Sequence, residues 1–107
     1  MAAEHLIVMS TTDSEEKART LACGVIDAKL GACAQIVGPI TSVYRWEGAV
    51  QTDPEWRIEI KTTSDRAAAL VEHIKANHDY DTPEVVAVPI TGGSAEYLAW
   101  VIDESKA

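Results

Sequence analysis

Residues 31–63, GACAQIVGPITSVYRWEGAVQTDPEWRIEIKTT, contain the pattern that decides the fold. Both halves of this stretch are rich in β-branched and aromatic residues, which favour strands. Residues 47–54 lie between the halves and include Gly48, Asp53 and Pro54, which are frequent in turns. The stretch therefore predicts one long antiparallel hairpin. Its arms should run for about twelve residues or more, against the usual five or six.

The second half of the stretch alternates in hydrophobicity with a period of two, as a strand with one buried and one polar face does. The first half is interrupted at Pro39, which cannot donate a hydrogen bond within a central sheet, so a bulge or bend is expected there. In the alternating half, Trp56, Ile58 and Ile60 share one parity, and Glu55, Arg57, Glu59 and Lys61 share the other.

Arms of this length would extend beyond the small domain to which they belong. A ribbon carrying Tyr44, Trp46 and Trp56 would expose a large apolar area, and such areas usually mark interaction sites. We therefore expect another subunit to cover the ribbon, with these three side chains at the interface, because aromatic residues are enriched in interface cores. The alternative is that the rings stack on a ligand.

The rest of the chain alternates between strand and helix patterns. Thr12 with Glu15, or Asp13 with Glu16, fits a capping box at the start of the first helix, and Gly31 suits its end. The predicted elements are a strand at residues 5–9, this helix, the hairpin, a helix capped by Ser64 and ending at Asn77, a strand at residues 85–90, and a last helix capped by Ser94 with Tyr97, Leu98, Val101 and Ile102 facing inward.

This order of elements predicts a single α+β domain over residues 1–107, with a ferredoxin-like βαββαβ sandwich and an extra C-terminal helix. Four antiparallel strands would carry the two main helices on one face. In this topology the end of the first strand lies beside the start of the last. Met9, Ser10 and Thr11 should therefore approach residues 78–84.

The loop at residues 78–84 is the first candidate for a metal site, with His78, Asp79, Asp81 and Glu84 as ligands. Imidazole and carboxylate groups together suit zinc, manganese or iron, and also copper(II). The alternative is a solvated acidic loop in which His78 bonds a backbone group, because no multi-ligand spacing motif is present.

The two cysteines, Cys23 and Cys33, do not form a C-x-x-C motif. Cys23 falls in a helical apolar pattern and Cys33 in a strand pattern, so both are expected to behave as small buried hydrophobic residues. Cys33 could instead be a soft metal ligand or a redox thiol. Without a signal peptide or a long apolar span, the chain is expected to be cytoplasmic with reduced thiols.

The net charge of -8 and the pI of about 4.7 disfavour nucleic acid and anionic membranes as partners. An acidic surface favours solubility and leaves room for cations or basic partners. For catalysis, Gly92-Gly93 lacks the Lys-Ser/Thr of a phosphate-binding loop, and neither G-x-S-x-G nor H-E-x-x-H occurs. The sequence therefore does not predict an enzyme.

Several segments together resemble the CutA divalent-cation tolerance proteins, and the resemblance covers nearly the whole chain. They are GACAQI at residues 31–36, GPITSVYRWEG at residues 38–48, IKTT at residues 60–63, HDYDTPE at residues 78–84 and YLAW at residues 97–100. The resemblance implies a ferredoxin-like fold related to the PII signalling proteins, a tight homotrimer, and a link to copper and other divalent metals. Zinc is the second candidate metal.

In some members of that family, copper has been attributed to a cysteine that ends the first strand and to a His-His pair after the second helix. By position these correspond to Ser10, Asn77 and His78, of which only His78 is a ligand type that metals commonly take.

Three functions follow as hypotheses. The first is a trimeric metal-binding protein of cation tolerance. The second is a PII-like sensor that binds a small ligand in clefts between subunits, with Lys61, Arg45 and Tyr80 lining the cleft, and signals to a protein partner. The third is a ligand-free structural trimer.

Overall fold

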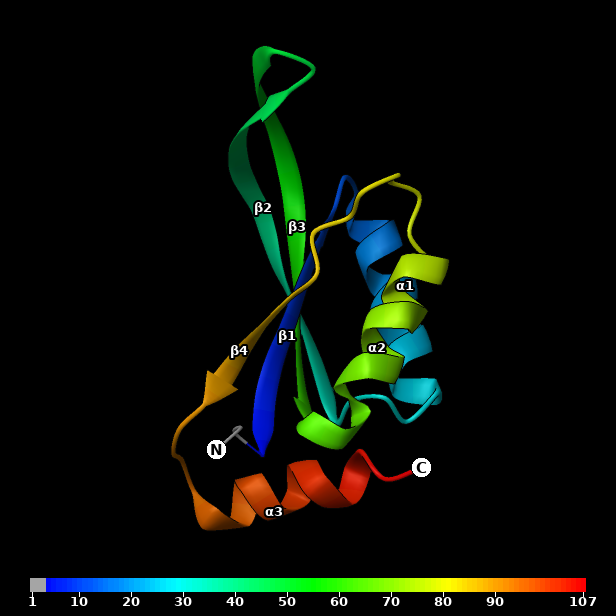
Figure 1. Cartoon of the computed structure of the whole chain (residues 1–107), viewed down its shortest axis with the longest axis vertical. Coiled ribbons are helices and arrows are strands. Elements are labelled where there is room, and N and C mark those ends of the chain that lie inside the picture. Colours follow the sequence, from blue (N-terminus) through cyan, green and yellow to red (C-terminus); the bar gives the residue numbers. More distant parts are fainter. Residues whose placement is uncertain (1–3) are drawn as a thin grey trace.

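A four-stranded antiparallel sheet with two helices on one face forms the body of the computed structural model, which describes residues 4–107 (Figure 1). The strands lie in the order β2-β3-β1-β4, which is the ferredoxin-like arrangement, and this confirms the predicted fold class. The elements are β1 (His5–Thr12), α1 (Glu15–Asp27), β2 (Cys33–Trp46), β3 (Ala49–Thr63), α2 (Ser64–Ala76), β4 (Val86–Ile90) and α3 (Ala95–Glu104).

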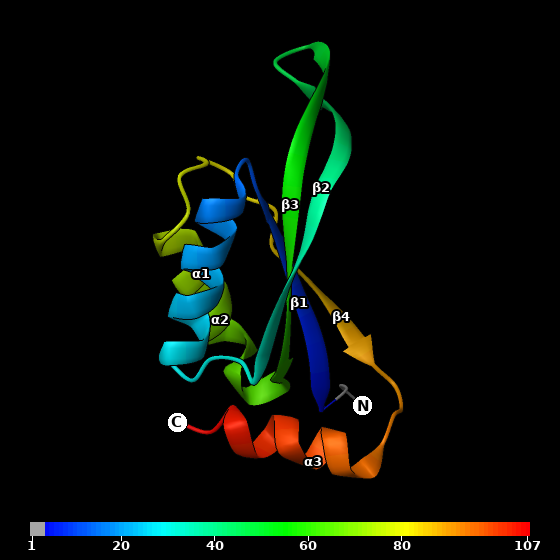
Figure 2. The same ribbon diagram turned by 180° about the vertical axis from the view of Figure 1, so that it is seen from behind.

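The β2-β3 hairpin extends far beyond the helices in both views of the chain (Figures 1 and 2). Its arms have 14 and 15 residues, which confirms the predicted length. Trp46 pairs with Ala49, so the turn consists of Glu47 and Gly48 alone, with φ values of 50° and 79°. Two successive residues with positive φ are typical of a tight hairpin turn whose twist matches the strands.

The predicted turn over residues 47–54 was therefore too long. Asp53 and Pro54 lie inside β3, where they pair with Ser42 and Thr41 of β2. A proline is tolerated here because β1 ends at Thr12, opposite Trp56, and within residues 4–107 no strand pairs with that side of β3 beyond it. The outer part of the hairpin is thus a two-stranded ribbon.

The bulge predicted at Pro39 is confirmed by a register shift between Val37 and Ile40. A Cβ atom added to Gly38 would lie 2.4 Å from Cδ1 of Trp56, so the glycine lets this indole lie directly against the backbone of β2. Trp56 is half-buried and packs against the core. It belongs to the base of the hairpin, and the sequence-based placement of Trp56 on the protruding ribbon was wrong.

Two of the three N-caps differ from the predicted ones by one or two residues, and α1 ends at Asp27 with Ala28 as its C-cap, before the predicted stop at Gly31. Ser14 caps α1, with its Oγ accepting a hydrogen bond of 3.1 Å from the backbone N–H of Lys17, in place of Thr12 or Asp13. The N-cap of α2 is Thr63, one residue before the expected Ser64. Ser94 caps α3 as predicted. Several capping side chains stand in a row at the starts of α1 and α2, and the local pattern cannot rank them.

The hydrophobic core lies between the two main helices and one face of the sheet. Cys23 is exposed, contrary to the prediction, because it lies about 100° around α1 from Ala22 of the buried stripe. Tyr97 is also exposed, while Val101 is the residue of α3 that is fully buried. The core consists of Val8, Ala18, Leu21, Ala22, Val25, Leu30, Ile58, Ile60, Leu70 and Ile74.

Helix α3 lies across the end of the sheet away from the hairpin tip (Figure 1). A hydrogen-bond contact of 3.0 Å between Nε2 of His5 and the carbonyl oxygen of Leu98 ties it to β1. None of the helices within residues 4–107 has the length and apolar content needed to cross a bilayer.

We predict that Gly38→Ala destabilises the protein, because the new Cβ would collide with the Trp56 ring and force it or β2 to move. Overpacking of this kind costs about 1–3 kcal/mol in the free energy of unfolding. Guanidinium unfolding at one fixed protein concentration would measure the loss. Gly92→Ala is the matched control, because nothing lies within 4 Å of a Cβ there. Equal midpoints for the two variants would contradict the close packing of Trp56.

Candidate functional site

His78 is held between the end of β1 and its own loop. Its side chain is fully buried, its Nε2 lies 2.7 Å from the carbonyl oxygen of Thr11, and its Nδ1 accepts a hydrogen bond of 3.1 Å from the N–H of Tyr80. Since Nδ1 is an acceptor, Nε2 carries the hydrogen and donates to Thr11. This contact joins β1 to residues 78–84 as the topology predicted. Both ring nitrogens of His78 are therefore occupied by backbone groups.

Of the other predicted metal ligands, only Asp79 stays beside His78, with its Oδ1 3.6 Å from Nδ1 of the ring. Asp79 pairs with Lys17, whereas Asp81 and Glu84 line a cavity beside the hairpin. Cys33 is far from His78. It pairs with Lys61 of β3, whereas Thr11, which contacts His78, pairs with Arg57. Arg57 and Lys61 are four residues apart, which is roughly 13 Å along the strand. Within residues 4–107, no group of three or more His, Cys, Asp or Glu side chains is placed to hold a metal ion.

The positions that correspond to the family's copper ligands also have other roles. The Oγ of Ser10 is buried and has no hydrogen-bond partner among the described residues. The side-chain amide of Asn77 donates a hydrogen bond of 2.8 Å to the carbonyl oxygen of His73 and so closes the end of α2. Neither residue supplies a ligand atom comparable to a thiolate or an imidazole.

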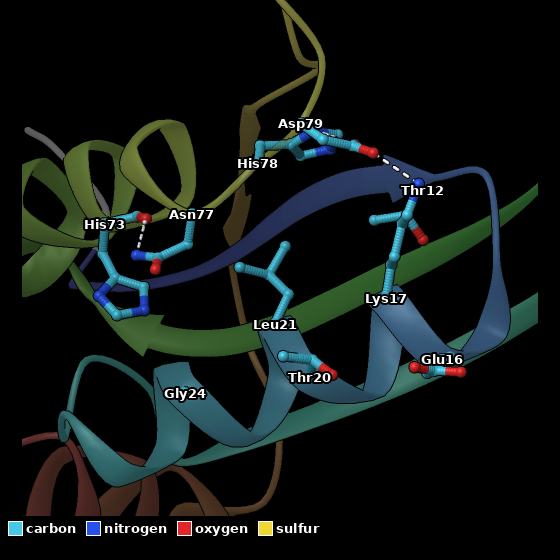
Figure 3. A pocket seen from close by; sticks show the side chains of 10 residues that line it. All are labelled: Thr12, Glu16, Lys17, Thr20, Leu21, Gly24, His73, Asn77, His78 and Asp79. Atoms are coloured by element: carbon cyan, nitrogen blue, oxygen red, sulfur yellow. Dashed lines mark hydrogen bonds and ion pairs between the residues drawn. The ribbon is translucent and has the colours of Figure 1, made fainter.

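A pocket of about 360 Å³ lies between α1 and α2, with side chains from both helices and from the following loop around it (Figure 3). The ammonium group of Lys17 bridges its rim, 2.5 Å from Asp79 and 2.9 Å from Asp13. Hydrogen bonds to these carboxylates raise the pKa of Lys17, and the same contact lowers the pKa of Asp79. The lining residues are Thr12, Glu16, Lys17, Thr20, Leu21, Gly24, His73, Asn77, His78 and Asp79.

The charged groups at this rim thus neutralise one another and link the two helices. Lys17 and Asp79 are about half exposed, so solvent screens their attraction, and the pair positions the loop rather than supplying much stability.

A second cavity, of about 500 Å³, lies between the hairpin and residues 80–84, and we call it the hairpin–loop cavity. It combines three aromatic side chains with three carboxylates, and none of its lining residues is basic. The lining residues are Thr11, Ser42, Val43, Tyr44, Trp46, Glu55, Tyr80, Asp81, Thr82 and Glu84.

Two of the aromatic rings in the hairpin–loop cavity are held through their hydroxyl groups. Tyr80 donates a hydrogen bond of 3.0 Å to Glu55, and Tyr44 donates one of 2.5 Å to Asp53. Burial raises the pKa of Tyr80, and its hydrogen bond to Glu55 adds to the rise. The hydrogen bond to Asp53 raises the pKa of Tyr44. Both rings therefore remain neutral and oriented at physiological pH.

The carboxylates of the hairpin–loop cavity lack positive partners. Glu55, Asp81 and Glu84 form no ion pair with any Lys, Arg or His in the described part of the chain. Charges that are not compensated at close range attract cations into a concave site. Glu55 was missed as a site residue, because in the sequence it appears only as one of the regularly spaced polar residues of β3.

The predicted cleft residues do not come together within one chain. Tyr80 lines the hairpin–loop cavity, but Arg45 pairs with Val50 near the hairpin tip. Lys61 pairs with Cys33 at the opposite end and bonds the side chain of Gln35. Val50, which marks the level of Arg45, and Lys61 are eleven residues apart, or roughly 36 Å along β3. A site with both basic residues would need more than one copy of the chain.

The fold and this cavity define a ferredoxin-like α+β domain with a long hairpin. The sequence profile of the family described as "CutA1 divalent ion tolerance protein" matches residues 6–104. The chain belongs to this family.

Named relatives agree with this assignment. "Protein CutA 1, chloroplastic" of rice is 48% identical over 94% of this chain and 57% of its own length. "Divalent-cation tolerance protein CutA" of Thermus thermophilus is 45% identical over 89% of this chain and 92% of that protein. The chain thus spans little more than half the length of the rice relative, and 56% of the similar Arabidopsis protein.

Solved structures show the same fold. The crystal structure of CutA1 from Oryza sativa superposes with a TM-score of 0.94 at 46% identity, covering 98% of this chain and 96% of that one. The structure of the divalent cation tolerance protein from Thermus thermophilus superposes with a TM-score of 0.90 at 43% identity, covering 94% of this chain and 97% of that one.

We predict that Lys17→Met raises the pKa of Asp79 towards the ordinary carboxyl range, because the variant removes the hydrogen bond that lowers it. A folded pKa below the unfolded value means that the pair stabilises the protein above the unfolded pKa of about 3.9, and that this contribution is lost as the pH falls through the folded value. Carboxyl NMR titration measures the shift. Lys17→Arg should preserve the low pKa, and Lys75→Met, which removes a pair with Glu72, should not change it.

Proposed function

We propose that this protein binds divalent cations at the hairpin–loop cavity and contributes to divalent-cation tolerance. The observation that carries the proposal is the set of three carboxylates, Glu55, Asp81 and Glu84, which face one cavity without a positive partner in the described chain. Membership of a family described by divalent ion tolerance supports it.

Copper is the first candidate metal and zinc the second. For a given set of nitrogen and oxygen ligands, the affinity for divalent metals rises to a maximum at copper(II). Asp81 and Glu84 are the ligands that we propose from this chain. Because residues 4–107 gather no group of three potential ligands for a metal, a complete site requires a group from a second copy.

We also propose that three copies form a homotrimer, as the resemblance to CutA proteins implies. Trp46 and Val50 on the hairpin are 51% and 62% exposed in the single chain. Val86 and Val88 of β4 are also exposed, and they lie on the face of the sheet opposite the helices. Strand β2 and strand β4 form the two sheet edges, and pairing of edges between copies would cover both features.

A small-ligand sensor is a second candidate. It is favoured by the aromatic walls of the same cavity, since a metal ion alone has no need of apolar walls.

The metal proposal predicts that the untagged parent protein binds copper(II). The Asp81→Asn/Glu84→Gln double variant should bind it about tenfold more weakly or worse, because both charges leave the cavity. Titration calorimetry in a non-chelating buffer measures this. Glu104→Gln is the control, since this exposed carboxylate lies at the end of α3 and forms no ion pair within the described residues. Equal affinity in all three proteins would refute the assignment of these ligands.

The trimer proposal predicts that Val50→Asp shifts the assembly towards single chains, because it places a charge on the exposed apolar ribbon. Sedimentation at several dilutions should show the molecular mass of three chains for the parent protein and a lower mass for the variant. Ala69→Asp adds the same charge to an exposed position of α2 and should leave the mass unchanged. A parent protein that sediments as a folded single chain would overturn the proposal.

A further inference from the structure

We infer that His78 is a positioning residue, which holds the loop at residues 79–84 against β1 and is not a ligand of any metal ion that the protein binds. The inference rests on the proposed function in one respect, since Asp81 and Glu84, the proposed cation ligands, lie on this loop. It goes further, because it gives His78 a role that metal coordination does not describe.

The loop reaches β1 at a point where the sheet no longer covers that strand. Strand β4 begins at Val86, opposite Met9, and within residues 4–107 no other strand pairs with this edge of β1 beyond Met9. The His78 ring makes its contact two residues further on, with Nε2 2.7 Å from the carbonyl oxygen of Thr11. The ring therefore attaches the loop to the main chain of β1 where β4 does not reach.

The two ring nitrogens of His78 have opposite roles in this link. Nδ1 accepts the N–H of Tyr80 at 3.1 Å, so Nε2 carries the hydrogen that is donated to Thr11. A metal ion binds an imidazole through the lone pair of one nitrogen. At Nδ1 the ion would displace the Tyr80 N–H, and at Nε2 it would require loss of the hydrogen donated to Thr11. Coordination through either nitrogen therefore breaks the link that places the loop.

Burial makes this link stronger than the neighbouring attachment of the loop. The side chain of His78 is 0% exposed, whereas the ion pair of Lys17 with Asp79 has both side chains about half exposed. Hydrogen bonds are stronger in a buried, less polar environment, and polar groups left unpaired there are costly. Solvent screens the exposed ion pair. His78 thus contributes more to the position of the loop than Lys17 does.

The rest of the loop takes its position from His78. The hydrogen bond to Nδ1 fixes the backbone of Tyr80, whose ring lies 4.6 Å from the His78 ring at an interplanar angle of 53°. The hydroxyl of Tyr80 donates to Glu55 of β3 at 3.0 Å, and Asp81 follows directly in the chain. Removing a residue that orients a metal ligand from outside the coordination shell commonly changes metal affinity by about 10–100-fold.

The two neighbouring positions to which the family resemblance assigns copper agree with this role. Ser10 is fully buried, and the side-chain amide of Asn77 is bonded to the carbonyl oxygen of His73. A metal ion at His78 would therefore find neither a thiolate nor a second imidazole at these positions, and those are the donors that copper and zinc prefer. The structure thus disagrees with a copper site of that type in this chain.

Hydrogen exchange on the metal-free protein tests the link itself. His78→Ala should speed exchange of the Tyr80 amide hydrogen by about tenfold or more, because the variant removes its buried acceptor. His73→Ala, which removes another half-buried histidine on α2, is the matched control and should leave this exchange unchanged. Nitrogen NMR of the parent protein should show His78 with its hydrogen on Nε2. Unchanged Tyr80 exchange in His78→Ala, or a hydrogen on Nδ1 in the parent, would overturn the inference.

Metal titrations separate positioning from coordination. At a zinc concentration that saturates the amide shifts of Asp81, the ring nitrogens of His78 should keep their resonances, whereas coordination would shift the bound nitrogen. Copper(II) affinity, measured by calorimetry, should fall about tenfold or more in His78→Ala. It should stay close to the parent value in His78→Gln, because the glutamine amide can donate to Thr11 but has no imidazole nitrogen.

Equal losses of copper(II) affinity in His78→Gln and His78→Ala would overturn the inference, and so would a zinc-dependent shift of either ring nitrogen, because a ligand behaves in this way. If His78→Ala does not fold, the measurements on the parent and His78→Gln still decide between the two roles. Absence of metal binding by the parent would refute the proposed function, and the exchange and tautomer results would then decide the position of the loop without it.

Discussion

The pairing of β2 with β3 is the constraint on which the rest of the structure depends. A two-residue turn brings the strands together at Glu47 and Gly48, and the register continues to Cys33 and Lys61 with one shift at the Gly38-Pro39 bulge. Between Trp56 and the turn, the described part of the chain adds no third strand to the ribbon. The extra length therefore adds backbone hydrogen bonds and exposed side chains but no core, and it creates the surfaces to which we assign function.

The two hydrogen bonds of the His78 ring determine where the loop after α2 can lie. By bonding Thr11 with one nitrogen and Tyr80 with the other, the ring fastens this loop beside the base of the hairpin. Tyr80 then reaches Glu55, and the loop forms one wall of the hairpin–loop cavity. A histidine that looks like a ligand in the sequence thus acts as a structural link, and the cation site that we propose uses the carboxylates of the cavity instead.

The candidate site could be predicted from the sequence only in part. The approach of Thr11 to residues 78–84 followed from topology, because the ends of neighbouring antiparallel strands are adjacent in any ferredoxin-like sheet. The role of Glu55 did not follow, because its alternating position in β3 is shared with Arg57 and Glu59, which pair with each other at 3.0 Å. Which polar residues face a cavity depends on what packs over the sheet, and no local period contains that information.

By itself the sequence determined the order of the elements, the length of the hairpin, the bulge at Pro39 and the family, because these depend on period, on backbone restrictions and on contiguous motifs. Tertiary structure alone decided that Trp56 packs on Gly38, that Cys23 faces solvent and that His78 turns both nitrogens to the backbone. It also separated Lys61 from Arg45 along the sheet. These outcomes depend on contacts between segments distant in the chain, and a side chain's chemistry becomes a site only once such contacts have set its neighbours and its exposure.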